Sequence, residues 1–88
     1  MKLAKIIGTV TATAKDAQFS GHKLLVCDII DGTGAVTEPG MVVADTVGAG
    51  VGETVIITTG SAARLPSGTS GIPVDAVIVA IVDNIKLS

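Results

Sequence analysis

Five short runs of β-branched and other aliphatic residues, separated by turn-forming residues, are the feature that most constrains this fold. Of the 88 residues, 12 are Val, 10 are Ile and 10 are Thr, and these side chains suit pleated strands because they are stiff at χ1. Leu and Glu, which favour helices, number only five and two. A chain of this length forms one domain, residues 1–88. The runs predict strands over residues 2–13, 22–30, 41–47, 54–59 and 76–85.

Turn signals between the runs are closely spaced. Asp31-Gly32-Thr33-Gly34 ends the second run, Glu38-Pro39-Gly40 leads into the third, and residues 48–53 form a glycine-rich connection. Residues 60–75 are the longest segment outside a strand, and residues 61–64 within it are expected to form a short helical turn with Ser61 as its N-cap. This pattern predicts an all-β fold, a small five-stranded OB-like barrel, whose closure removes exposed strand edges.

Two of the runs also predict which side chains are buried. In the second, Leu25, Cys27 and Ile29 fall on one face, because successive side chains of a strand alternate between its faces. In the fifth, residues 77–82 are all apolar. A continuous apolar run is typical of a strand that is buried on both faces, so we expect no solvent-facing side there.

The chain is more apolar than a small monomer needs. Hydrophobic residues make up 48% of it, and the mean hydropathy is +0.69. Short chains bury a smaller fraction of their surface than long ones, and surplus apolar surface usually forms a subunit interface. Composition therefore predicts an obligate oligomer.

Charge and aromatic content weigh against several classes of partner. Six Lys and Arg residues against eight Asp and Glu residues give a net charge of −2, so there is no electrostatic reason to bind nucleic acid or an anionic membrane. Phe19 is the sole aromatic residue, too few for a platform that stacks bases. No run of 18 apolar residues and no signal peptide are found. A soluble cytoplasmic protein is the expectation.

The residues that could carry chemistry are few. His22 is the only imidazole and is expected to be an exposed residue at a strand end, while Cys27 is expected to be a small buried apolar residue. Asp28 and Asp31 flank a strand end, where turn capping is a better interpretation than a metal pair. We therefore expect no catalytic, metal or cofactor site, and no enzyme.

The glycine-rich segment has two interpretations. Gly48-Ala49-Gly50-Val51-Gly52 resembles part of a phosphate-binding loop, but the position that should be the last glycine is Glu53, and a strand follows instead of a helix. The Gly-Lys-Ser/Thr of a Walker loop is missing. A tight connection between two strands with close approach of the backbone is the preferred interpretation.

The segment Gly60-Ser61-Ala62-Ala63-Arg64 leaves two alternatives of equal weight. Arg64 could cap a neighbouring element of the same chain. It could instead pair across a subunit interface with a carboxylate such as Asp75 or Glu53, because the planar guanidinium binds a carboxylate through two hydrogen bonds.

Three motifs in order resemble a known family. They are residues 45–55 (DTVGAGVGETV), residues 60–64 (GSAAR) and residues 73–83 (PVDAVIVAIVD), and the opening MKLAKIIGTV follows the same pattern. Together they resemble the pentameric vertex proteins of bacterial microcompartment shells, those of carboxysomes and of ethanolamine-utilisation and related metabolosomes. Thr54 departs from the pattern, since many relatives carry an aromatic residue there.

The resemblance implies a structural role and a place for it. An OB-like barrel would assemble as a ring of five that caps the vertices of a polyhedral shell in the cytoplasm, beside hexameric shell proteins, with a narrow pore along the ring axis. A ring of this kind needs a head-to-tail interface that closes. The alternative function, an OB-like module that binds a small ligand or nucleic acid, would need a basic, aromatic face. Residues implied at the subunit interface or near the pore are Gly48, Ala49, Gly50, Gly52, Glu53, Gly60, Ser61, Ala62, Arg64 and Asp75.

Overall fold

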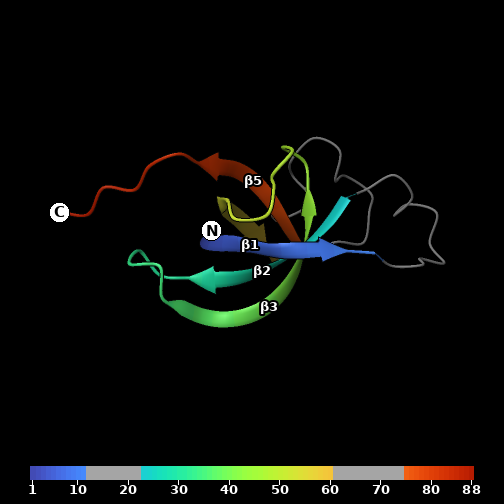
Figure 1. Ribbon diagram of the computed structural model, residues 1–88, viewed down its shortest axis with the longest axis horizontal. Coiled ribbons are helices and arrows are strands. Elements are labelled where there is room, and N and C mark those ends of the chain that lie inside the picture. Colours follow the sequence, from blue (N-terminus) through green and yellow to red (C-terminus); the bar gives the residue numbers. More distant parts are fainter. Residues whose placement is uncertain (12–22, 61–74) are drawn as a thin grey trace.

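The computed structural model describes residues 1–11, 23–60 and 75–88, and these form a closed barrel (Figure 1). Around the barrel the strands follow the order β1-β2-β3-β5-β4. All neighbours are antiparallel except β3 and β5, which are parallel. The predicted all-β five-stranded barrel is therefore confirmed. The strands are β1 (Lys2–Val10), β2 (Lys23–Ile30), β3 (Val36–Asp45), β4 (Thr54–Thr59) and β5 (Ala76–Val82).

The predicted strand bounds hold for β4 and, within the described residues, for β2. The other predicted bounds were wrong. β1 ends at Val10, which leaves Thr11 outside the strand, and β3 runs from Val36 to Asp45 rather than over residues 41–47. β5 ends at Val82 rather than at residue 85. β5 stops there because Val82 faces Thr54, the first residue of β4, and has no ladder partner beyond it. Residues 12–13, His22 and the expected helical turn at 61–64 lie outside the described residues.

The early start of β3 has a specific cause. Cys27 pairs with Met41 and Ile29 pairs with Glu38, so Asp28 faces two residues of β3, Pro39 and Gly40. This is a β-bulge, a place where a strand tolerates proline and an extra residue. Gly40 adopts φ +76°, and its amide donates to Asp28 Oδ1 at 3.0 Å. Pro39 and Gly40, whose composition predicts a turn, therefore form a bulge within β3 instead.

β1 bends to pair with two neighbours. Its first half pairs with both β4 and β2, and the register with β2 shifts between Ile6 and Gly8. A Cβ atom at Gly8 would lie 3.2 Å from Val26 Cγ1, closer than most side chains tolerate. Glycine therefore allows β2 to approach β1 at this corner of the barrel.

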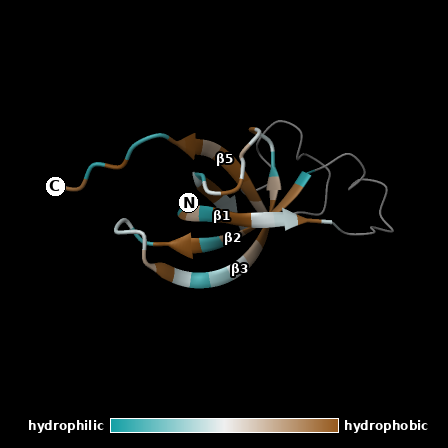
Figure 2. Ribbon diagram, in the orientation of Figure 1, coloured by the Kyte–Doolittle hydropathy of each residue, from teal (hydrophilic) through white to brown (hydrophobic). Residues whose placement is uncertain are grey.

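The core fills the barrel interior. Leu25, Cys27 and Ile29 of β2 all point inward, as the alternation predicted, and each is at most 4% exposed. In β5 the expectation of two buried faces holds for Ala76 to Ile78, whereas residues 79–82 are only half buried. Figure 2 shows how hydrophobic β5 is along its length. The main cluster is Ala4, Ile6, Leu25, Cys27, Ile29, Val43, Ala49, Val55, Ile57, Ala76 and Ile78.

Candidate assembly surfaces

The glycine loop (residues 46–53) joins β3 to β4, and its first half is held by the side chain of Asp45. Asp45 Oδ1 accepts hydrogen bonds from the backbone amides of Val47 at 2.9 Å and Gly48 at 3.0 Å. This is the turn that an Asp carboxylate commonly makes with the amides that follow it. Gly48 has φ +81°, a conformation that glycine adopts without steric cost.

Lys23, at the start of β2, fixes the same half of the loop from the other side. Its Nζ donates to the carbonyl oxygen of Ala49 at 2.7 Å and lies 3.4 Å from Asp45 Oδ2. The Asp45 side chain is 1% exposed, and Oδ2 accepts no hydrogen bond from the residues that the structure describes. The Lys23 ammonium is therefore the charge partner of this buried carboxylate, which would be costly to leave alone.

The second half of the loop is a tight turn. The amide of Glu53 donates to the Gly50 carbonyl at 3.1 Å, and Gly52 has φ +91°, as the third residue of a type II turn requires. Glu53 Oε1 accepts from the Gly50 amide at 2.6 Å. Backbone bonds of Gly52 and Glu53 with Ile6, at 2.9 and 3.0 Å, tie the turn to β1. The predicted tight connection between two strands is confirmed. Because the Gly50 amide already donates to the Glu53 carboxylate, it is not free to bind a phosphate.

Apolar side chains nevertheless project from this fixed loop. Val51, the second residue of the turn, is 62% exposed, and Val47 is 39% exposed. Ile7, next to the Ile6 carbonyl that binds Gly52, is 49% exposed. Ala49 is fully buried in the barrel core. The exposed apolar side chains of the loop are therefore its two valines, whereas Ala49, which belongs to the family motif, is not exposed.

A cleft of about 440 Å³ lies at the other end of β4. Gly60 and Asp75, both predicted as contact residues, meet here: the Gly60 amide donates to the Asp75 carbonyl at 2.7 Å. Val42 of β3 is 49% exposed on its wall. In the described ranges β3 pairs with β5 only at Ala44 and Asp45, so the cleft opens where β3 has no β5 neighbour. Its lining is Lys2, Met41, Val42, Thr59, Gly60, Asp75 and Ala76.

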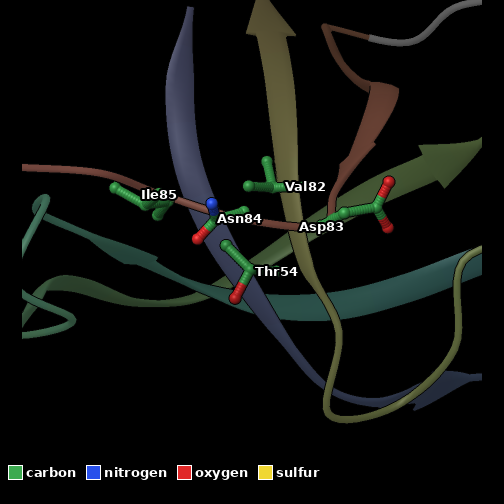
Figure 3. Close-up of a pocket in the computed structure, with 5 residues that line it drawn as sticks. All are labelled: Thr54, Val82, Asp83, Asn84 and Ile85. Atoms are coloured by element: carbon green, nitrogen blue, oxygen red, sulfur yellow. The ribbon is translucent and has the colours of Figure 1, made fainter.

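A smaller recess of about 250 Å³ lies where β4 begins and the chain leaves β5 (Figure 3). Thr54 and Asn84 lie close together there, while the Asp83 carboxylate points away from Thr54. The neighbouring Ile85 is 41% exposed. The recess thus combines a small hydroxyl side chain with one exposed aliphatic residue.

The groups considered for chemistry have structural roles where the structure describes them. Cys27 is fully buried, and burial, with a smaller effect of the neighbouring Asp28 charge, raises the pKa of its thiol. Asp31 Oδ1 accepts from the Thr33 amide and hydroxyl at 2.8 and 2.6 Å and from the Ala35 amide at 3.1 Å. Asp31 is therefore the predicted turn cap, and these bonds lower the pKa of its carboxyl. Asp28 instead stabilises the β3 bulge.

No group of three or more potential metal ligands comes together in the described ranges. Likewise, none of the secondary structure in those ranges is a helix with the length and hydropathy to span a bilayer.

The structure places the predicted contact residues in two groups and adds two residues that the sequence did not single out. Gly48, Gly50, Gly52 and Glu53 lie on the glycine loop, and Gly60 and Asp75 lie at the cleft. Ser61, Ala62 and Arg64 lie outside the described residues. The additions are Lys23 and Asp45. An Asp directly before a glycine-rich segment was a usable signal, but Lys23 became its partner only through the β2–β3 register.

Comparison with known proteins identifies the relatives of this barrel. Residues 1–83 match the family described as ethanolamine utilisation protein EutN/carboxysome. The carboxysome shell vertex protein CcmL of Synechocystis is 41% identical over 88 residues, which cover 100% of this chain and 88% of the relative. The microcompartment shell vertex protein GrpN of Rhodospirillum rubrum is 44% identical over 86 residues, covering 98% and 97%.

A solved structure agrees with these relatives. The GrpN pentameric microcompartment shell protein from Rhodospirillum rubrum superposes with a TM-score of 0.88 at 43% identity, covering 100% of both chains. The names of the relatives confirm the predicted vertex role and do not support the alternative of a ligand-binding or nucleic-acid-binding module. The chain belongs to the EutN/carboxysome family of bacterial microcompartment shell vertex proteins.

Proposed function

We propose that five copies of this chain form a closed ring that caps each vertex of a microcompartment shell in the bacterial cytoplasm. Hexameric shell proteins of the same shell would surround each ring, because a sheet of hexagons closes into a polyhedron only with pentagons at its corners. The pentameric Rhodospirillum rubrum relative supports the number five. The role is structural rather than catalytic, in keeping with relatives that are named as shell proteins.

One observation carries the proposal: large apolar side chains are exposed on a barrel whose strands already form a closed ring. Because the barrel is closed, strand edges are not what would drive association. Apolar surface is, since its burial is favourable and a small monomer rarely leaves so much exposed. In the described ranges the exposed residues are Met1, Ile7, Val36, Val42, Val47, Val51, Ile85 and Leu87, each at least 39% exposed.

The positions of the candidate residues support a head-to-tail ring. A cyclic pentamer uses two different patches of each chain, one to meet each neighbour. The glycine loop and the cleft are two such patches, at opposite ends of β4. We assign Gly48, Gly50, Gly52, Glu53, Gly60 and Asp75 to subunit contacts on this ground.

Native mass measurement tests the ring. The chain has a mass of 8.7 kDa, so a ring of five has a mass of about 44 kDa under non-denaturing conditions. A stable monomer, or a ring of another number, would contradict the proposal.

Electron microscopy tests the place of the ring in a shell. Hexameric shell proteins of the same microcompartment, co-expressed with this chain, are expected to form closed polyhedra. The same proteins without it are expected to form sheets, tubes or particles with open corners. Closed particles of the same shape in both samples would argue against a vertex role.

A further inference from the structure

Four of the eight exposed apolar side chains lie on or beside the glycine loop or at the cleft, the two structures at opposite ends of β4. The loop patch consists of Ile7, Val47 and Val51, on or beside the glycine loop. At the other end, Val42 lies on the wall of the cleft, and the ion pair of Lys2 with Glu38, 3.2 Å long, brings the chain start alongside β3. β4 has six residues, which at about 3.3 Å each place its two ends about 20 Å apart. Ile7 is nearer to Val42 than this, because its neighbour Gly8 and Val42 both pair with Val26 of β2.

The loop patch is convex and already fixed in shape. Val51 stands at the apex of a turn whose two ends are joined by the Gly50–Glu53 hydrogen bonds. The base of the loop is held by Asp45 and Lys23. Docking a preformed apex costs less conformational entropy than ordering a free loop, so more of the binding energy is retained.

The cleft is concave and has a mixed lining. Met41 and Val42 give it an apolar wall on β3, and Lys2 and Asp75 flank it with one charge of each sign. Its volume of about 440 Å³ is ample for a small aliphatic side chain on a turn. The cleft therefore offers what the loop patch lacks, an apolar concavity with a polar margin.

We propose that the Val51 apex of one chain docks in the cleft of the next chain around the ring, against Val42. This inference rests on the proposed function and deepens it by naming the surfaces that meet. A second copy is the occupant because a closed ring needs two unlike patches on one chain. The Val51 apex and the cleft lie at opposite ends of β4 and are two such patches.

Cysteine cross-linking tests the contact. Val51→Cys and Val42→Cys both replace exposed residues, and a disulfide forms only when the two Cα atoms lie within about 7 Å. Under mild oxidation, the chain carrying both substitutions is expected to give a ladder of cross-linked species up to five chains on a denaturing, non-reducing gel. Each single variant is expected to run as a monomer. The native Cys27 is fully buried and does not compete.

A matched pair controls for chance encounters. Leu87 is 64% exposed, close to the 62% of Val51, and Val51→Cys with Leu87→Cys is expected to give no ladder. The docking inference would be wrong if the protein has a five-chain native mass but Val51→Cys with Val42→Cys gives no cross-linked ladder. It would also be wrong if the control pair cross-links equally well. Neither result would contradict the five-chain ring itself. The absence of any five-chain species in the unmodified protein would instead overturn the proposed function, and the inference with it.

Discussion

The glycine loop and the β2–β3 turn (residues 31–35) use the same device in opposite surroundings. In each, an Asp accepts hydrogen bonds through Oδ1 from the backbone amides that follow it: Asp31 is the first residue of the β2–β3 turn, and Asp45 directly precedes the glycine loop. Asp31 stands in solvent and needs no other partner. Asp45 is buried, and Lys23 supplies its counter-charge.

The difference indicates what each turn is for. The β2–β3 turn is exposed throughout, and its tip carries the small or polar residues Gly32, Thr33 and Gly34. The glycine loop presents valines to solvent at positions set by a buried ion pair. A loop that only joined two strands would not need Val51 exposed on so constrained a backbone, so we expect changes in the glycine loop to alter assembly and changes in the β2–β3 turn to alter local stability alone.

Removing the cation at Asp45 is expected to have the largest effect. Lys23→Met keeps the length of the side chain but leaves a buried carboxylate without its counter-charge and the Ala49 carbonyl without its donor. Because the Lys23 side chain is half exposed, we expect a loss of about 2 kcal/mol in the free energy of unfolding, less than the roughly 3–5 kcal/mol lost when a fully buried pair is broken. Urea denaturation measures it.

Lys5→Met is the matched control for Lys23→Met. Lys5 is an exposed lysine of β1, and its replacement should change the free energy of unfolding by less than about 0.5 kcal/mol. Equal losses in the two variants would show that the Lys23–Asp45 pair contributes nothing of its own.

The sequence was sufficient for most of the barrel but not for this pair. β2 and β4 could be located because Leu25, Cys27 and Ile29 alternate with outward residues and because residues 54–59 are almost all β-branched. The predicted third strand began too late, at residue 41 instead of Val36, because Pro39-Gly40 has the composition of a turn. Local propensity could not reveal that a bulge opposite Asp28 would absorb both residues.

The assembly surfaces were less predictable than the fold. The glycine motif directed attention to the loop that carries the exposed valines, and Gly60 and Asp75 to the end of the barrel where the cleft lies. Which loop side chains face solvent depends on how the loop folds back on β1, so the exposure of Val51 and the burial of Ala49 could not be inferred from the motif. Lys23 and Asp45 lie 22 positions apart and meet only through the register of two strands.

Substituting two glycines that have nearly the same φ angle distinguishes an effect on ring assembly from an effect on folding stability. Gly52 in the glycine loop has φ +91° and Gly34 in the β2–β3 turn has φ +92°, and neither has an atom within 4 Å of an added Cβ. Alanine at either site is expected to lower the free energy of unfolding by about 1 kcal/mol, because a left-handed conformation strains any residue with a Cβ. Only Gly52→Ala should also lower the fraction of five-chain rings, measured by native mass at equal concentration. Equal ring fractions would remove the turn from the interface.

Weakening the hydrogen bond between the Glu53 carboxylate and the Gly50 amide is expected to have a smaller effect on stability. Glu53→Gln keeps an oxygen that can accept from the Gly50 amide, now 2.6 Å from Glu53 Oε1, but removes the charge that strengthens the bond. We expect a loss below about 1 kcal/mol in the free energy of unfolding, measured by urea denaturation. Glu38→Gln is the control, because Glu38 makes a surface ion pair of little worth.

The smallest effect is expected at Asp31, and it should depend on pH. Hydrogen bonds from Thr33, with smaller contributions from the Ala35 and Gly34 amides, lower the pKa of Asp31 below its usual 3.8. A carboxyl whose pKa is lower in the folded than in the unfolded state contributes its full stability above pH 3.8 and loses it as the pH falls through the folded value. Asp31→Ala should therefore be less stable than the parent protein at pH 7, and the gap in urea midpoints should narrow towards pH 3. A gap that stays constant over this range would mean that the charge of Asp31 has no part in capping the turn, and that its hydrogen bonds with Thr33 and Ala35 act equally well with a protonated carboxyl.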